Sequence, residues 1–128
     1  MANPNIVSVA TIAGGSVGHN LTGSWFVLIT VTAEYLIKVN SITVANIDGT
    51  NGSTCDVKVV KANHTILGIT DYDTSRTLYL AKTVEVPADD VLVVLDTPIY
   101  LMEGDTLQAL AENSGDLDIL VSFDVIID

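Results

Sequence analysis

Apolar and polar side chains alternate along residues 117–127 of the chain. Every second position there is apolar, and these positions are Leu117, Ile119, Val121, Phe123, Val125 and Ile127. A period of two places such a set on one face of a β-strand, whereas a helix would scatter it around its circumference. Leu120 and Ile126 break the alternation, so we expect the opposite face of this strand to be partly covered as well.

The same alternation predicts strands along the rest of the chain. They lie at residues 5–12, 24–32, 35–45, 54–61, 77–86, 91–95 with 99–102, and 105–112. β-branched residues are frequent in them, and the segments AGGSVG, NIDGTNGS, VPADD, EGD and NSGD are interpreted as turns. About eight short strands predict an all-β fold, an antiparallel β-sandwich of jelly-roll or Greek-key type. Residues 1–128 are expected to form a single domain, with residues 1–12 as a first strand or as an arm that adds a strand to a neighbour.

Acidic residues stand beside glycines at two of the turns, Glu103-Gly104-Asp105 and Gly115-Asp116. Both glycines fall between predicted strands, where a hairpin requires a residue with positive φ. Asp is common at such turns because its side chain hydrogen-bonds to the nearby backbone. We therefore interpret these carboxylates as turn residues and not as a metal or acid/base site.

The segment NIDGTNGSTCDV is the best candidate for a calcium-binding loop. An EF-hand would place glycine sixth and glutamate twelfth, but Asn51 and Val57 stand there. We interpret its first half as a turn in which Asp48, Asn51 and the two glycines adopt unusual backbone angles. Weak calcium binding by Asp71 and Asp73 in DYDTSR stays open as an alternative.

The formal net charge is −11, from 5 Lys and Arg against 16 Asp and Glu, and no basic residue follows Lys82. Nucleic acids and anionic membranes attract basic proteins, so both are excluded as partners. Apolar residues nevertheless make up 48% of the chain, and the mean hydropathy is +0.47. Since monomers rarely expose large apolar patches, we expect another subunit or a partner to cover part of this surface.

Few residues are candidates for catalysis. Cys55 is the only cysteine, and it alternates with Val57 and Val59, so we expect a buried structural thiol. His19 in a glycine-flanked turn and His64 in a polar loop are expected at the surface, and neither belongs to a catalytic signature. We therefore predict a protein that is not an enzyme and has no catalytic, cofactor-binding or metal-binding residues and no cofactor.

Three stretches of the chain carry a resemblance: MANPNIV at the start, KVNSITVANIDGTN (residues 38–51) and LAKTVEVPADDVLVVLDTPIYLMEGDTLQALAENSGDLDILVSF (residues 80–123). They resemble a family of small virion structural proteins of tailed bacteriophages, especially phages of marine cyanobacteria. The resemblance implies a non-enzymatic, β-rich part of the particle that is present in many copies. Residues 63–77 are longer and more irregular than the hairpin of that family, so no role is carried over to them.

This resemblance predicts a capsid decoration or cement protein that binds the major capsid protein or other virion proteins and stabilises the head shell. With it we expect a homo-oligomer, a trimer. The alternative is a neck, tail or fibre component that contacts other virion proteins or host surface glycans. The first residues, MANPNIVSVATIAGG, lack the basic and long apolar regions of a signal peptide, so we expect synthesis in the cytoplasm. The resemblance implies a final location in the virion.

Overall fold

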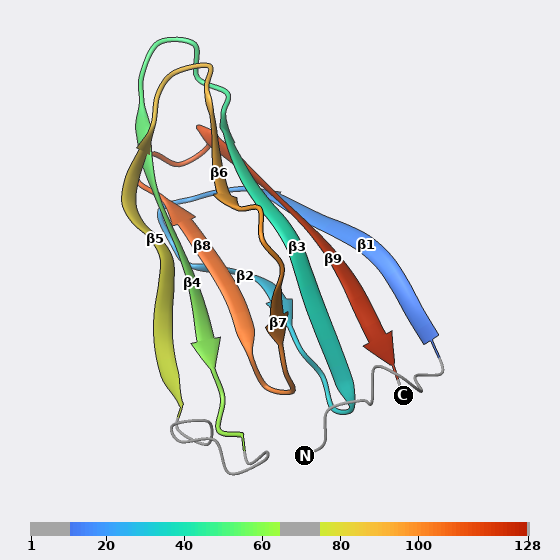
Figure 1. Cartoon of the computed structure of the whole chain (residues 1–128). Helices are drawn as coiled ribbons and strands as arrows, with labels where there is room; N and C mark the ends of the chain where they lie inside the picture. Colours follow the sequence, from blue (N-terminus) through green and yellow to red (C-terminus); the bar gives the residue numbers. More distant parts are fainter. Residues whose placement is uncertain (1–10, 65–74, 128) are drawn as a thin grey trace.

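The computed structural model describes residues 11–64 and 75–127, which form two antiparallel β-sheets (Figure 1). The strands are β1 (Thr11–Asn20), β2 (Phe26–Thr30), β3 (Tyr35–Asn46), β4 (Ser53–Lys61), β5 (Arg76–Val86), β6 (Val91–Leu95), β7 (Ile99–Leu101), β8 (Thr106–Ala111) and β9 (Leu117–Ile127). The predicted all-β sandwich is confirmed. The described segments contain no helix that is long and apolar enough to cross a membrane.

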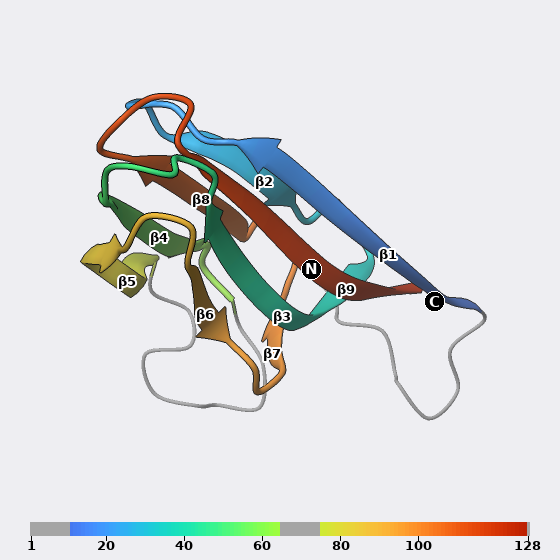
Figure 2. The ribbon, with the colours of Figure 1, turned by 90° about the horizontal axis from the view of Figure 1, so that it is seen from above.

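The two sheets pack face to face as the two layers of a sandwich (Figure 2). One sheet has the order β1-β9-β3-β6, with β7 also paired to β3, and the other has the order β2-β8-β4-β5. Neighbours within a sheet are mostly distant in the chain, because the chain crosses between the layers. When β6 and β7 are taken as one interrupted strand, this is the strand order of a jelly roll, one of the two predicted types.

The core lies between the sheets and consists of the inward-facing members of the alternating pattern. Its fully buried residues include Val39, Ile42, Val44, Val57, Leu107, Ala109, Leu117 and Val121. In β3 the register against β9 shifts between Val39 and Ser41. This bulge keeps Val39 and Ile42 on the same buried face although three positions separate them.

The two exceptions to the alternation in β9 differ in their surroundings. Ile126 is buried in a second small cluster with Leu36 and Met102, on the side of the sheet away from the main core. Leu120 is exposed on that same side. The expected partial covering of the outer face is therefore confirmed, and it lies at the Ile126 end of β9 and not at Leu120.

The first strand differs most from its prediction. Residues 5–10 lie outside the described residues, and the predicted AGGSVG turn is part of β1. Gly15 lies beneath the ring of Phe123 on β9, and a Cβ added to it would stand 3.2 Å from that ring. A glycine in this strand therefore marks close packing with a neighbouring strand and not a turn.

The predicted hairpin glycines are confirmed in their backbone conformation. Gly104 has φ +88° and Gly115 has φ +94°. A Cβ at Gly104 would also stand 2.9 Å from the Cβ of Ala62, whereas at Gly115 the nearest atom would be 3.8 Å away. Gly104 is therefore required both by its backbone angle and by the space beside it.

We expect Gly104→Ala to lower the free energy of unfolding by about 2 kcal/mol, because it adds left-handed strain and a close contact. Gly115→Ala adds the strain alone, so we expect about 1 kcal/mol. Gly23→Ala is the control, since its Cβ would meet only the Ala111 carbonyl oxygen at 3.9 Å. Urea unfolding measures all three, and an equal loss in the three variants would contradict this ranking.

Candidate interaction surface

Asp105 is the most buried carboxylate of the described residues, with an exposed fraction of 0%. It lies in the turn after β7 and is the residue immediately before β8. One carboxylate oxygen, Oδ1, accepts a hydrogen bond from the Ala62 amide at 2.9 Å and lies 2.8 Å from His64 Nε2. The other, Oδ2, accepts hydrogen bonds from Lys61 Nζ at 2.5 Å and from the Met102 amide at 2.9 Å. The side chain thus ties the end of β4 to the turn between β7 and β8.

The surroundings of Asp105 favour its charged form. Burial alone raises the pKa of this carboxyl group, but the hydrogen bonds from Lys61, Met102, Ala62 and His64 outweigh it and hold the pKa below its usual value. Asp105 therefore remains ionised and paired inside the protein, where its role is to hold the fold.

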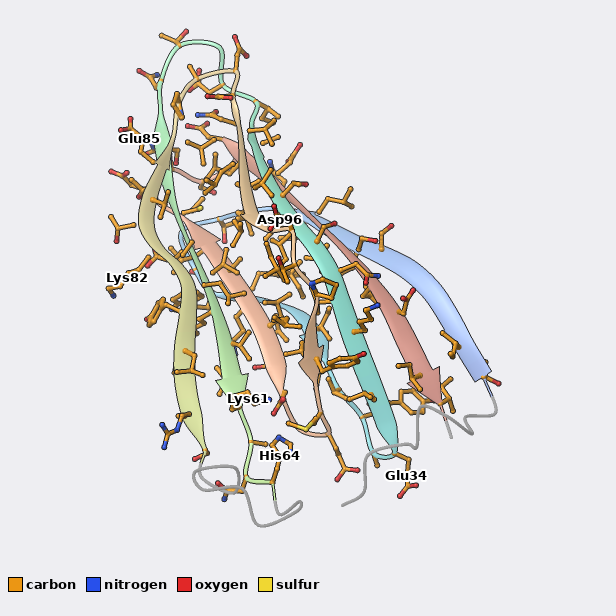
Figure 3. All side chains as sticks on the ribbon, in the orientation of Figure 1. Glu34, Lys61, His64, Lys82, Glu85 and Asp96 are labelled. Carbon is orange, nitrogen blue, oxygen red and sulfur yellow. The ribbon has the colours of Figure 1, made fainter. Side chains whose placement is uncertain are left out.

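The prediction that His64 is a surface residue is wrong, because its exposed fraction is 1%. His64 and Lys61 lie together at the end of β4 (Figure 3), and both contact a carboxylate more than forty positions along the chain. No local pattern in the sequence indicates so distant a partner. Because both His64 and Asp105 are buried, their contact stabilises the structure and does not offer a site to a substrate.

The NIDGTN segment forms a turn, as predicted, but side-chain hydrogen bonds and not unusual backbone angles hold it. Asp48 Oδ1 accepts hydrogen bonds from the Thr50 amide at 2.8 Å and the Asn51 amide at 3.4 Å. The hydrogen bond from Thr50 is the main cause of the lowered pKa of Asp48. None of Asp48, Gly49, Asn51 and Gly52 has the positive φ that we expected.

Asp71 and Asp73, the alternative calcium ligands, lie outside the described residues. Among the residues that are described, no group of three or more His, Cys, Asp and Glu side chains is arranged to hold a metal ion.

Cys55 is fully buried, as predicted for a structural thiol. Burial, with a smaller effect of Asp56, raises the pKa of this thiol to about 11. His19 does not lie in the predicted turn but in β1, and its ring stacks on Phe26 with the two centroids 3.6 Å apart.

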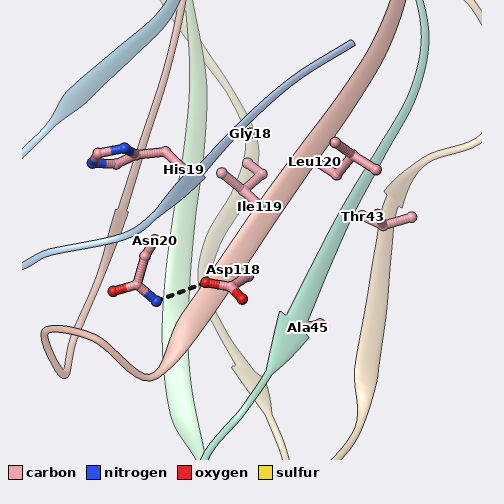
Figure 4. A pocket seen from close by; sticks show the side chains of 8 residues that line it. All are labelled: Gly18, His19, Asn20, Thr43, Ala45, Asp118, Ile119 and Leu120. Atoms are coloured by element: carbon pink, nitrogen blue, oxygen red, sulfur yellow. Dashed lines mark hydrogen bonds between the residues drawn. The ribbon is translucent and has the colours of Figure 1, made fainter.

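A groove of about 480 Å³ lies on the outer face of the five-stranded sheet, where β1 ends (Figure 4). Its lining residues are Gly18, His19, Asn20, Thr43, Ala45, Asp118, Ile119 and Leu120. The strand register explains the hollow, because Leu120 stands between Gly18 and Thr43, which have no side chain or a short one. At the other end Asn20 Nδ2 donates a hydrogen bond of 2.7 Å to Asp118 Oδ1.

An apolar surface extends from this groove across β3 to β6. Thr43 pairs with Val93 and Ala45 with Val91, so these side chains share the outer face with Leu120. The exposed fractions of Val91, Val93 and Leu120 are 55%, 56% and 52%. The outer patch, as we name these five residues, therefore presents a row of large apolar side chains to solvent on a strongly acidic protein.

The outer face of the four-stranded sheet carries an aromatic cluster that sequence reasoning missed. Lys58 Nζ lies 3.8 Å from the ring centroid of Trp25, and Lys82 Nζ lies 4.6 Å from that of Tyr79. The two rings are 6.2 Å apart. Because ammonium groups lie over both rings, these ring faces are not free to stack on a sugar. The cluster joins β4, β5 and the residue before β2, which are far apart in the chain.

No protein-family model matches the sequence, and no curated protein matches it. Among solved structures, a chain of the Bacillus endospore appendages, which are disulfide-linked pili, is 8% identical with a TM-score of 0.43. That comparison covers 92% of this chain and 88% of the pilus chain.

Two further structures are of viral particles, the VP2 subviral particle of infectious bursal disease virus and the T=1 particle derived from infectious bursal virus. The subviral particle gives 13% identity and a TM-score of 0.46, covering 94% of this chain and 33% of VP2. The T=1 particle gives 13% identity and a TM-score of 0.39, covering 94% and 32%. The chain thus spans about a third of each of these two viral chains. Similarities at this level do not assign a function.

We expect Asp105→Asn to lower the free energy of unfolding by about 3 kcal/mol at pH 7. The substitution removes the negative charge that balances Lys61, and the amide NH₂ group would face backbone and side-chain groups that are themselves hydrogen-bond donors. The matched control is Asp96→Asn, at an exposed carboxylate whose contact is the Thr97 hydroxyl at 3.4 Å. There we expect a change below about 0.5 kcal/mol. Chemical denaturation measures both.

The same variant tests the pH dependence. The pKa of Asp105 is lower in the folded protein than its ordinary value of 3.8, so its ionisation stabilises the fold above that pH. This contribution is lost as the pH falls through the folded-state pKa. Asp105→Asn should therefore show a smaller loss of stability below pH 3.8 than the natural protein, and an identical acid profile would contradict the role assigned to Asp105.

Proposed function

We propose that this chain is a non-enzymatic structural subunit of a tailed-bacteriophage particle, and that it decorates the head by binding the assembled shell. The observation that carries the proposal is the outer patch. It is a contiguous apolar surface on a chain of net charge −11, and contiguous apolar surfaces of this kind are typical of protein interaction sites.

The shape of the surface favours a protein partner. Val91 and Val93 on β6 and Leu120 on β9 flank β3 in one sheet, so the patch spans three strands and includes part of the groove. An exposed apolar area of this kind resembles the centre of a protein interface. The groove contributes one polar pair, Asn20 and Asp118, which orients a partner more than it attracts one.

The position of the patch in the chain supports the same proposal. All five residues of the outer patch fall within residues 38–51 and 80–123, the two longer stretches that resemble the phage virion family. Attachment of many copies would stabilise a shell by mass action, because a protein that binds only the assembled lattice lowers its free energy. Repetition over the lattice multiplies weak contacts.

Immunogold labelling of particles tests the location. The particles are purified from lysates of the bacterium in which this chain is produced and labelled with antibody against it. We expect gold over the heads. Gold confined to the neck or tail would replace head decoration by the alternative, and unlabelled particles would overturn the proposal of a virion subunit.

A second test concerns the outer patch itself. We expect the double variant Val93→Glu, Leu120→Glu to bind particles depleted of this protein at least about tenfold more weakly than the natural chain, because it buries two charges at the contact. The control is Val27→Glu, which changes an exposed apolar residue of the other sheet. Co-sedimentation measures both, and equal binding by the double variant and the natural chain would contradict docking through the outer patch.

A further inference from the structure

The first strand is a long and regular edge of the five-stranded sheet. β1 pairs with β9 over ten consecutive positions, from Thr11 with Ile127 to Asn20 with Asp118, and no register shift interrupts them. In the described part of the chain its other edge has no paired strand. Every second residue of β1 therefore directs its backbone N–H and C=O groups away from the sheet.

This edge also stands clear of the rest of the sandwich. Residues 11–16 are exposed on both faces of the sheet, because the four-stranded sheet does not extend beneath them. In Figures 1 and 2 the beginning of β1 lies at the outer margin of the molecule. A strand from another molecule can therefore approach this edge without displacing any element of residues 11–64 and 75–127.

The other edges are protected. β5 meets β4 with two shifts of register, carries Arg76, Lys82 and Glu85, and has Thr83 at φ 52°. β2 and β6 are only five residues long. Bulges, charges and short length are the usual devices that prevent an edge from pairing with another chain. β1 has none of them.

The distribution of charge favours a second copy of this chain as the partner. Two chains of net charge −11 repel each other, but no Asp, Glu, Lys or Arg occurs before Glu34. The nearest carboxylates are on β9, one strand further in. Both carboxylates reach toward β1, since Asp118 Oδ1 accepts a hydrogen bond of 2.7 Å from Asn20 Nδ2 and Asp124 Oδ1 would lie 3.4 Å from a Cβ on Gly14. β1 itself adds no charged side chain to the edge that would pair.

We infer that β1 pairs antiparallel with β1 of a second copy and joins the two five-stranded sheets into one. Antiparallel pairing of identical strands creates a two-fold axis perpendicular to the sheet, the commonest symmetry of oligomers. This axis keeps each side chain on its own face of the sheet, so directly opposed residues must be an even number of positions apart. We therefore place the axis at Ser16, which pairs residues 12–20 of the two copies and sets Ser16 opposite Ser16.

This inference does not depend on head decoration, since it uses an edge and not the outer patch. It gives a two-fold dimer in place of the trimer that the sequence led us to expect. Sedimentation velocity of the natural chain over a range of concentrations is the first test. We expect a species of twice the chain mass of 13.5 kDa. A monomer at every concentration, or a trimer, would overturn the inference.

Two substitutions test the edge directly. Ser16→Glu places like charges close together at the two-fold axis, and we expect it to weaken the dimer at least about tenfold while the circular dichroism of the strands is unchanged. Thr77→Glu makes the same change at an exposed position on the β5 edge and should leave the dimer intact. A dimer that tolerates Ser16→Glu, or one that only Thr77→Glu disrupts, would place the contact elsewhere and contradict the pairing.

Cross-linking gives an independent readout. Cys55 is buried, so Ser16→Cys introduces one accessible thiol into each chain. A short bis-maleimide should then join two chains through position 16, because the two thiols lie on one face near the axis. Thr77→Cys is the control and should remain a single chain on a denaturing gel. Equal cross-linking at the two positions would show random collision and would overturn the pairing.

Discussion

The burial of one face of each sheet against the other is the constraint on which this structure depends. Successive side chains of a strand point to opposite faces, so a sandwich forms only when each strand offers apolar residues at alternate positions. Ile42 against Val121 and Val57 against Ala109 are inward pairs of this kind in the two layers. The bulge in β3 shows the strength of this constraint, because the strand takes up one extra residue so that its apolar positions stay inside.

Most strands can be predicted from the sequence because the constraint is local. The predicted bounds 91–95 and 117–127 agree with β6 and β9, and the remaining strands from β2 to β8 agree within two residues. The first strand could not be predicted in the same way. Its glycines are typical of turns, and only the position of Phe123, more than one hundred residues away, explains Gly15 as a strand residue.

The polar sites were less predictable for the same reason. Glu103 and Asp105 are neighbours at one turn, yet Glu103 accepts a hydrogen bond from the Glu34 amide at the surface, while Asp105 joins Lys61 and His64 inside the protein. The sequence indicates a turn at both residues. It does not indicate which carboxylate is enclosed, because that depends on which loops meet at that end of the sandwich.

The pairing of β1 with β9 has a consequence for the order of events during synthesis. β9 lies between β1 and β3 in the sheet. β1 therefore cannot form its pairs, such as Thr11 with Ile127, until β9 has been synthesised. The β4–β5 pair can form as soon as β5 leaves the ribosome, but most of the five-stranded sheet cannot. A chain whose contacts are so distant in sequence folds slowly and late. The nascent chain therefore carries an incomplete five-stranded sheet until β9 has been synthesised, and its unpaired apolar strands can bind chaperones during that interval.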